Sequence, residues 1–324
     1  MAGVTANATE AVGLEMRAVE ELFDAELRSD LPCVDQLVTH VRRFRGKMLR
    51  PKMVFLCGRA VGGITPQHVT VAAVVEMVHM ATLVHDDVLD ESELRRRGAT
   101  INHLKGNEAA VMLGDYLISH SYHLCSSLGS QDAARMIART TNQVCEGELL
   151  QLHNRNNLDL DEETYVTIIG RKTASLIAAS CYLGATLAGA TDVVAREFEK
   201  FGQSLGIAFQ IQDDLLDLVG DQENVGKTLG LDVAKRKLTL PVIHFLRTAP
   251  QEHRELCRSL LRGSEPNQLE RVRNLILPSG AIDYSRDRVR RLIERGKQCL
   301  TGLPHNGAID ELLTLADTLL QRDR

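Results

Sequence analysis

An apolar helical run that ends in three aspartates, Asp86, Asp87 and Asp90, constrains this chain more than any other feature. An α-helix turns once in about 3.6 residues, so Asp86 and Asp90 lie on one face and repel each other. They also lie at the C-terminal end of the helix, where the helix dipole favours cations. A bound cation removes both penalties, and hard oxygen ligands of this kind suit Mg²⁺. The alternative for a single copy is a solvated acidic helix face.

The same D-D-x-x-D spacing returns at Asp213, Asp214 and Asp217, again at the end of a long apolar helical run. Two copies of this aspartate motif are much harder to explain by chance than a single copy. If the two helices face each other, both triads surround one cavity, and an apolar core does not accept their charges uncompensated. The sequence therefore predicts a metal cluster held by both triads.

Basic residues follow each triad. Arg95, Arg96 and Arg97 come shortly after the first triad, and Lys227 and residues 235–237 come after the second. Guanidinium groups bind phosphates through two parallel hydrogen bonds. Acids that hold Mg²⁺ and bases that hold phosphate together suit a metal-bridged polyphosphate, whereas the plainer interpretation is a run of charges on a loop.

A third basic cluster, residues 42–51, precedes the first triad. Gly46 lets the backbone approach a ligand closely, and Pro51 can begin the next helix. The cluster is therefore either an anion site or a solvated basic turn, and the sequence leaves these two interpretations open.

Helical periodicity runs through most of the chain, and no alternating β pattern of useful length interrupts it. Trp is absent, aromatic residues make up 4% of the chain and there are 8 prolines, a mixture that favours helices over β-sandwiches. No Gly/Ser-rich linker divides the chain. We expect residues 1–13 to be disordered and residues 14–324 to form one all-α domain. The principal helices are expected over residues 14–27, 66–90, 106–128, 131–153, 192–219, 268–275, 283–300 and 308–322.

Charge and cysteine usage limit the partners and the compartment. The formal net charge of -5 gives no sign of a nucleic-acid partner. Seven cysteines without a C-x-x-C pair predict reduced thiols and a cytoplasmic protein. His120 and His123 have no third ligand nearby in the sequence, so we expect core or surface histidines rather than a metal site. No secretory signal is evident, and residues 173–191 favour a packed internal helix over a transmembrane segment.

Several blocks of the chain resemble the trans-prenyltransferases, or isoprenyl diphosphate synthases. Residues 83–96 resemble the first aspartate-rich motif of that family with its arginines, and residues 209–217 resemble the second. The resemblance covers residues 45–322 and is nearest to the bacterial long-chain polyprenyl diphosphate synthases. Further blocks in the order of the family are Gly114-Asp115, Glu146-Gly147-Glu148, Lys172-Thr173, Gly226-Lys227 and residues 237–241.

The resemblance implies a helical bundle of the isoprenoid synthase type with a central cavity, usually a homodimer. It implies that three Mg²⁺ ions bridge the aspartates to an allylic diphosphate, which ionises and is attacked by isopentenyl diphosphate. By resemblance, the metal ligands are Asp86, Asp87, Asp90, Asp213 and Asp217, and the groups that bind the allylic diphosphate are Arg95, Lys172, Lys227 and Lys237. By resemblance, Gly46, Lys47, Arg50, His79 and Arg96 bind isopentenyl diphosphate, and Thr173 and Gln210 lie beside the allylic carbon.

Product length is predicted from the helix that leads into Asp86. In this family, bulky aromatic residues four or five positions before the motif close the pocket and give short products. Here Ala81 and Thr82 are small, so a growing chain can pass toward Met77 and Val78. We therefore expect a long all-trans product of roughly C30–C50, with a geranylgeranyl or farnesyl diphosphate synthase as the alternative.

Three other classes explain the sequence less well. A class I terpene cyclase shares the D-D-x-x-D motif but needs neither a second such triad nor the Gly46–Arg50 cluster. A non-catalytic subunit of a heteromeric prenyl synthase tends to lose aspartates or lysines, and none is missing here. A helical scaffold leaves the paired acids and bases unexplained. We expect no transmembrane segment, and contact with a membrane only transiently during product release.

Overall fold

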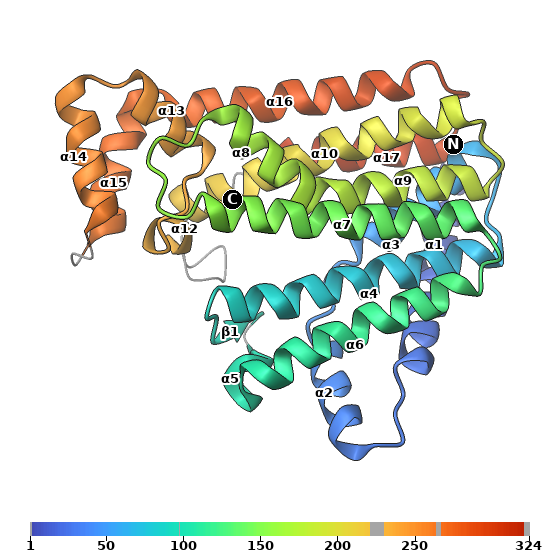
Figure 1. The fold of residues 1–324 in the computed structure, drawn as a ribbon. Helices are drawn as coiled ribbons and strands as arrows, with labels where there is room; N and C mark the ends of the chain where they lie inside the picture. The colour runs from blue at the N-terminus through green and yellow to red at the C-terminus, as the bar shows by residue number, and fades with distance from the viewer. Residues whose placement is uncertain (1, 97, 221–229, 264–266, 321–324) are drawn as a thin grey trace. The chain divides into compact units, whose positions relative to one another are not determined.

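The computed structural model describes residues 2–96, 98–220, 230–263 and 267–320. Helices dominate these residues, so the predicted all-α class is confirmed (Figure 1). The two short strands in the described part of the chain, β1 (Leu94–Arg95) and β2 (Gly98–Ala99), pair in antiparallel fashion.

Most of the helix bounds in the described residues lie close to the predicted ones. In the first half of the chain the helices are α1 (Ala2–Glu26), α2 (Pro32–Arg42), α3 (Leu49–Val61), α4 (Pro66–Leu89), α5 (Ile101–Lys105), α6 (Asn107–Ser126) and α7 (Gln131–His153). The middle of the chain forms α8 (Glu162–Ile169), the π-helix η1 (Gly170–Ala174), α9 (Ser175–Leu187), α10 (Asp192–Val219) and α12 (Leu231–Ala234). The last part forms α13 (Leu240–Thr248), α14 (Gln251–Arg262), α15 (Gln268–Ile276), the 3₁₀ turn η2 (Leu277–Ser279), α16 (Ala281–Leu300) and α17 (Gly307–Leu320).

The chain folds into two compact units, each built from segments that are far apart in the sequence. The first unit contains Met1–Thr141, Ala179–Glu199 and Leu303–Leu312. The second contains Asn142–Ala178, Lys200–Gly302 and Leu313–Arg324. The helices α7, α9, α10 and α17 contribute residues to both units.

Helix α4 is the core helix of the first unit and carries the first aspartate triad at its end. It begins at a capping box in which the backbone N–H of Thr65 donates to His68 Nδ1 at 3.0 Å, and Pro66 occupies the first turn. Residues 71–78 are all buried, and all of them except Glu76 are apolar, so α4 is surrounded by the core of this unit. It packs against α1, α3 and α6. Burial of each large apolar side chain stabilises this packing by about 1.5–3 kcal/mol.

In the described ranges, α4 is also the one helix long and apolar enough to cross a membrane by length and composition. This is weak evidence for a span, because 67% of its apolar window is buried within the protein, as in the core helix of a soluble protein. Residues 173–191 do not meet that test, and most of the side chains of α9 are buried.

Helix α1 differs from the prediction at its beginning, because it extends back to Ala2 through residues expected to be disordered. Residues 2–12 contain no proline and four alanines, so nothing in their composition stops a helix. The predicted surface helix over residues 14–27 is confirmed to within one residue at its end; it buries Val19 and Phe23, and Leu27 directly after it is also buried.

In the second unit, η1 and the C-terminal part of α10 approach each other closely. A Cβ atom added to Gly206 on α10 would lie 2.6 Å from the Cα of Ala174 in η1. Only a glycine leaves room for this approach. The close packing brings the side chain of Thr173 in η1 to that of Gln210 on α10.

Candidate active site

The first aspartate triad closes α4. Asp87 is buried at 4% exposure, whereas Asp86 and Asp90 are half-buried. The pKa of Asp87 is raised mainly by burial, and the charges of Asp86 and Asp90 raise it further while Arg95 opposes the shift. Three carboxylates within two turns of one helix form the all-oxygen donor set that Mg²⁺ takes, so the residues fit that ion.

Arg95 on β1 forms a two-point ion pair with Asp87. Its Nε lies 3.0 Å from each carboxylate oxygen, and its Nη2 lies 2.7 Å from Oδ1. Such charge-assisted, two-point hydrogen bonds are stronger than single neutral ones. The structure therefore places a predicted metal ligand and a predicted diphosphate-binding arginine in direct contact.

Hydrogen bonds to backbone carbonyls fix the turn between α4 and β1, the strand that carries Arg95. The N–H of Ser92 donates to the carbonyl of Asp87 at 2.9 Å, and the Asn102 amide donates to the same carbonyl at 3.2 Å. The Thr100 hydroxyl donates to the carbonyl of Ser92 at 2.6 Å. The turn between the end of α4 and β1, which bears Arg95, is thus fixed in position.

Arg96 and Gly46 form the first part of the predicted isopentenyl diphosphate site. Arg96 Nη1 donates to the carbonyl of Phe44, and a Cβ at Gly46 would overlap the Arg96 guanidinium. Gly46 is thus needed for space beside a side chain, in addition to the close backbone approach that the sequence suggested. Lys47, the next residue, is exposed, and Met48, the N-cap residue of α3, has a φ of 46°.

Glu76 is a buried acid in the middle of α4, surrounded by arginines. Burial raises the pKa of Glu76, and Arg50, Arg96 and Arg45 oppose that shift. Burial also lowers the pKa of Arg50 to about 10, with Glu76 acting in the opposite direction. Among the residues that the structure describes, no hydrogen-bond partner reaches the buried Nε of Arg50. A buried cationic donor without a partner is suited to an anionic ligand.

His79 belongs to the same cluster and is kept neutral. Burial lowers its pKa well below the usual value, and the charges of Arg50, Arg95 and Arg96 lower it further. The structure thus brings together Arg50, His79 and Arg96, three of the predicted isopentenyl diphosphate ligands. This arrangement favours the anion-site interpretation of the basic cluster over a solvated turn.

The predicted chain-length residues lie on α4 ahead of the triad. Met77, Val78 and Ala81 are fully buried at 0% exposure. Thr82 is half-buried, and its hydroxyl donates to the carbonyl of His79 at 2.7 Å. No bulky aromatic side chain occupies these four positions.

In the second unit, Gln210 links the predicted residues to a buried carboxylate. Its Oε1 accepts from the Thr173 hydroxyl at 3.0 Å, and its Nε2 donates to Asp214 Oδ1 at 2.8 Å. The Tyr165 hydroxyl donates to Asp214 Oδ2 at 2.6 Å. Burial raises the pKa of Asp214 to about 7, and the charge of Asp232 raises it further. Asp213, on the same helix, is half-buried.

Lys172 lies in η1 and forms an ion pair with Glu148 on α7. The neighbouring Arg171 pairs with Glu146. Between these two acids, a Cβ at Gly147 would lie 2.5 Å from the backbone nitrogen of Lys172. The block of residues 146–148 therefore has a physical explanation. Gly147 permits the close approach of α7 to η1, and the acids on either side of it orient Arg171 and Lys172. π-Helical turns of this kind occur often at functional sites.

Asp217 and Lys237 are connected through Asp232. The backbone N–H of Asp232 donates to Asp217 Oδ2 at 3.1 Å, and Lys237 Nζ lies 3.4 Å from Asp232 Oδ1. Lys227 lies outside the described residues. In the second unit, η1 carries both Lys172 and Thr173, and Thr173 contacts Gln210. Asp217 and Lys237 both contact Asp232.

Comparison with known proteins agrees with this geometry. The family model described as polyprenyl synthetase matches residues 32–277. The chain is 36% identical to octaprenyl diphosphate synthase of Escherichia coli over 96% of both chains. It is 35% identical to heptaprenyl diphosphate synthase component 2 of Geobacillus stearothermophilus, over 95% of this chain and 96% of that one.

The chain belongs to the polyprenyl synthetase family.

Solved structures from this family have the same fold. A decaprenyl diphosphate synthase from Rhodobacter capsulatus superposes with a TM-score of 0.93 at 34% identity, over 99% of both chains. A polyprenyl synthase from Caulobacter crescentus, complexed with calcium and isoprenyl diphosphate, superposes with a TM-score of 0.90 at 33% identity, over 100% of this chain and 98% of that one. The predicted resemblance and the predicted prenyltransferase class are confirmed. The terpene cyclase and scaffold alternatives are not supported.

Sequence reasoning on this polyprenyl synthetase did not select Glu76, Tyr165 or Asp232 as site residues. Glu76 carried a signal, since it is a lone acid in the apolar run of residues 71–78. Tyr165 carried none, because it reaches Asp214 across 49 positions of sequence. Asp214 itself was read as part of the triad and was given no role.

Proposed function

We propose that this prenyltransferase extends an allylic diphosphate with isopentenyl diphosphate repeatedly, to a product of roughly C30–C50. Two observations support a long product: the small, buried Ala81 on α4, and relatives named octaprenyl and heptaprenyl diphosphate synthase. A geranylgeranyl-length product is the alternative within the same chemistry.

We propose Mg²⁺ as the metal, three ions per active site, held by Asp86, Asp87 and Asp90 on α4 and by Asp213 and Asp217 on α10. The all-oxygen donor set supports this choice. When bound, the metal neutralises the charge that develops on the leaving diphosphate.

Arg95, Lys172 and Lys237, with Lys227, are proposed to bind the allylic diphosphate. In the structure Arg95, Lys172 and Lys237 each contact a carboxylate, at Asp87, Glu148 and Asp232 respectively. These acids hold the bases in place and balance their charge before substrate arrives. Basic groups preset in this way stabilise a developing diphosphate charge without reorganisation.

Isopentenyl diphosphate is proposed to bind between Arg50 and Arg96, with Lys47, His79 and the Gly46 backbone. The observation that carries this assignment is the buried Arg50 Nε, for which the described residues offer no hydrogen-bond partner. His79 is neutral there, so it can donate a hydrogen bond without adding to the repulsion among the cations.

Thr173 and Gln210 are proposed to lie beside the allylic carbon. The Gln210 carbonyl oxygen accepts from Thr173, and its amide is held by Asp214, so both oxygens are fixed in orientation. Oriented oxygen dipoles stabilise positive charge on the carbon as the C–O bond breaks. The double bond of isopentenyl diphosphate then attacks that carbon, and the departing diphosphate accepts the proton that is lost. Exclusion of water protects the cation.

We expect a homodimer in the cytoplasm that touches membranes only transiently as product leaves. A second arrangement is a catalytic or non-catalytic subunit of a heteromer, because one relative is named component 2 of a heptaprenyl diphosphate synthase.

Purified protein should be incubated with Mg²⁺, isopentenyl diphosphate and each allylic primer in turn, and the products sized by mass spectrometry. We expect long-chain product from the protein alone. Asp86→Ala and Asp213→Ala should each lower turnover by at least about 100-fold, the size of a lost transition-state contact, with unchanged helical circular dichroism. Absence of condensation with every primer would overturn the proposal that this chain is active by itself.

A further inference from the structure

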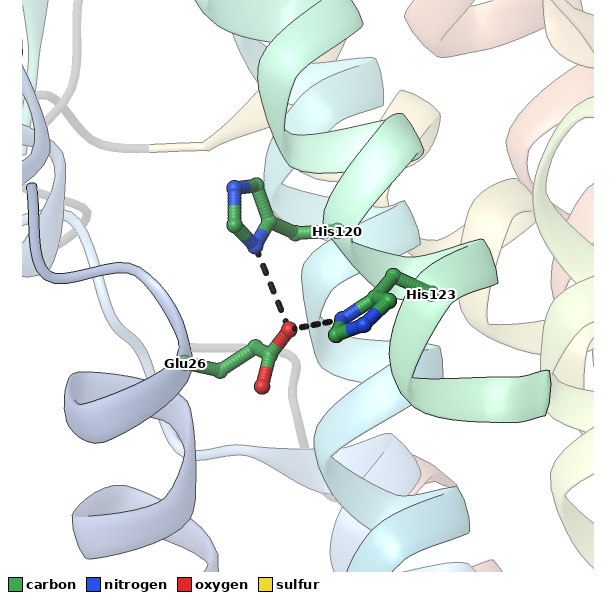
Figure 2. A group of neighbouring side chains, drawn as sticks. All are labelled: Glu26, His120 and His123. Atoms are coloured by element: carbon green, nitrogen blue, oxygen red, sulfur yellow. Dashed lines mark hydrogen bonds and ion pairs between the residues drawn. The ribbon is translucent and has the colours of Figure 1, made fainter. Parts of the chain in front are cut away.

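Glu26, the last residue of α1, lies against two histidines of α6, as Figure 2 shows. Its Oε1 is 3.2 Å from His120 Nδ1 and 2.8 Å from His123 Nδ1. One carboxylate oxygen therefore contacts both imidazoles. The three potential ligand atoms all lie within 4.8 Å of one another, and all three residues belong to the first unit.

The spacing of these atoms suits a small tetrahedral ion. His120 and His123 are three positions apart on α6, so they project from the same side of the helix. Ligands at about 2.0–2.1 Å from a tetrahedral Zn²⁺ are about 3.3 Å from one another. The distance of 3.2 Å from Glu26 Oε1 to His120 Nδ1 matches that value, and the distance of 2.8 Å to His123 Nδ1 is about 0.5 Å shorter. The two Nδ1 atoms lie within 4.8 Å of each other.

Burial makes the cluster both anchored and accessible. The side chains of Glu26 and His120 are 17% and 25% exposed, whereas that of His123 is 77% exposed. The ring of Tyr116 lies against that of His120, with centroids 4.3 Å apart, and limits its movement. Two ligands are therefore fixed, and the third faces the solvent from which an ion would enter.

The surroundings are acidic. The pKa of Tyr116 is raised mainly by burial, and the charges of Glu26, Asp30 and Asp35 raise it further. A cation beside Glu26 would therefore also be attracted by Asp30 and Asp35.

We propose that Glu26, His120 and His123 bind one divalent transition-metal ion, with Zn²⁺ as the reference case. Two imidazoles and one carboxylate, with water in the fourth position, are a common ligand set for Zn²⁺. Imidazole selects Zn²⁺ and its neighbours in the first transition row over Mg²⁺, so this site differs in metal preference from the aspartate triads. The sequence-based expectation of ordinary histidines lacked Glu26, which comes from 94 positions away from His120.

Binding would tie the end of α1 to α6. Each imidazole would bind through a neutral Nδ1 and keep its proton on Nε2, in place of its present contact with Glu26. Since α6 packs directly against α4, the ion would also stabilise the position of α6 beside the helix that carries the first triad. The proposal is independent of the prenyl-transfer assignment, which requires neither histidine.

Co²⁺ is the appropriate first probe, because its visible absorption reports tetrahedral coordination, and a thiolate charge-transfer band would reveal binding to cysteine instead. Full-length wild-type protein should be compared with His123→Ala, which alters an exposed side chain, and Glu26→Gln, which keeps the shape and removes the charge. His305→Ala is the matched control, because His305 is 71% exposed and pairs with Asp310 at 3.1 Å without a second imidazole.

We expect wild type and His305→Ala to bind one Co²⁺ tightly per chain, without a thiolate band. His123→Ala and Glu26→Gln should each bind it at least about tenfold more weakly, since losing a ligand costs at least as much as losing an outer-shell partner. Zn²⁺ should also raise the Tm of wild type by more than that of His123→Ala at the same Zn²⁺ concentration. Equal Co²⁺ affinity in wild type and His123→Ala would overturn the proposal, and so would binding accompanied by a thiolate band. Either result would leave Mg²⁺-dependent prenyl transfer, assayed separately, unaffected.

Discussion

The guanidinium of Arg95 donates from both Nε and Nη2 to the carboxylate of Asp87, at 2.7–3.0 Å. Asp87 is also one of the residues that we propose to bind metal, so a single buried carboxylate has two alternative partners. Before substrate arrives, the ion pair balances a charge that burial makes costly. If the diphosphate binds as proposed, Arg95 would transfer from Asp87 to the diphosphate, and Asp87 would then be available to hold the ion. The two residues should therefore be energetically coupled.

Replacement of Arg95 by alanine should destabilise the fold, because Asp87 stays buried without its partner. We expect Arg95→Ala to lower the free energy of unfolding by about 1–3 kcal/mol at neutral pH, measured by urea denaturation. The double variant Asp87→Asn/Arg95→Ala should recover most of that loss, because it removes the unpaired charge as well. If the effects of the two substitutions simply add, the ion pair is not a coupled unit.

Gly46→Ala should impair substrate binding with little effect on folding. The added methyl group would overlap the Arg96 guanidinium, which is the far end of a flexible side chain and can move aside. We expect an unchanged Tm and a raised KM for isopentenyl diphosphate, by roughly tenfold for one displaced charged contact. Gly302→Ala is the control, because no other atom lies within 4 Å of a Cβ at that position. Equal KM values for isopentenyl diphosphate in both variants would contradict the proposed contact between Arg96 and this substrate.

The sequence was sufficient to predict α4 and α10, because long apolar periodicity ending in D-D-x-x-D fixes both the helix type and its end. It also identified Gly46, Arg50 and Arg96 as one group through the family resemblance. The beginning of α1 at Ala2 was not predicted, because the composition of an alanine-rich segment without proline does not decide between helix and disorder.

Partnerships within the site were beyond sequence reasoning. The contacts of Asp214 with Tyr165 and of Glu26 with His120 join residues far apart in the chain, and no local pattern reports them. The π-helical turn that carries Lys172 and Thr173 lies directly against Gly147, and this contact is also a tertiary one. The sequence therefore predicted many of the residues of the candidate site, but it did not predict which of them contact one another.

Asp214 should make stability fall as pH rises. Its pKa in the folded protein is about 7, whereas an unfolded aspartate titrates near 3.9. The folded state therefore holds this proton more tightly, and the stabilisation is fully present below about pH 4 and lost as pH rises through about 7. The side chain in Asp214→Asn cannot titrate, so its free energy of unfolding should lack this pH-dependent contribution. Wild type and Asp214→Asn should be compared by denaturation between pH 4 and pH 7.

Asp161 provides the opposite control. Its carboxylate caps α8 by accepting from the N–H of Thr164 at 2.7 Å, and that hydrogen bond lowers its pKa. Its stabilisation is therefore present above the pKa of an unfolded aspartate and lost as pH falls through the lower folded value. Asp161→Asn should remove a contribution to the free energy of unfolding that grows as pH rises, opposite in sign to that of Asp214.

A difference in the free energy of unfolding between wild type and Asp214→Asn that shows no trend from pH 4 to pH 7 would contradict the raised pKa of Asp214.

Ala81 gives the sharpest test of product length. Its side chain is fully buried on α4, ahead of the first triad and beside Val78. A phenylalanine at this position would fill the space through which we propose that the chain grows, so Ala81→Phe should shorten the product seen by mass spectrometry. Overpacking should also lower the free energy of unfolding by about 1–3 kcal/mol, so helical circular dichroism and Tm must be measured in parallel. Ala81→Val, with a smaller added volume, should give products of intermediate length. A folded, active Ala81→Phe enzyme with the product distribution of wild type would show that the growing chain does not pass this residue.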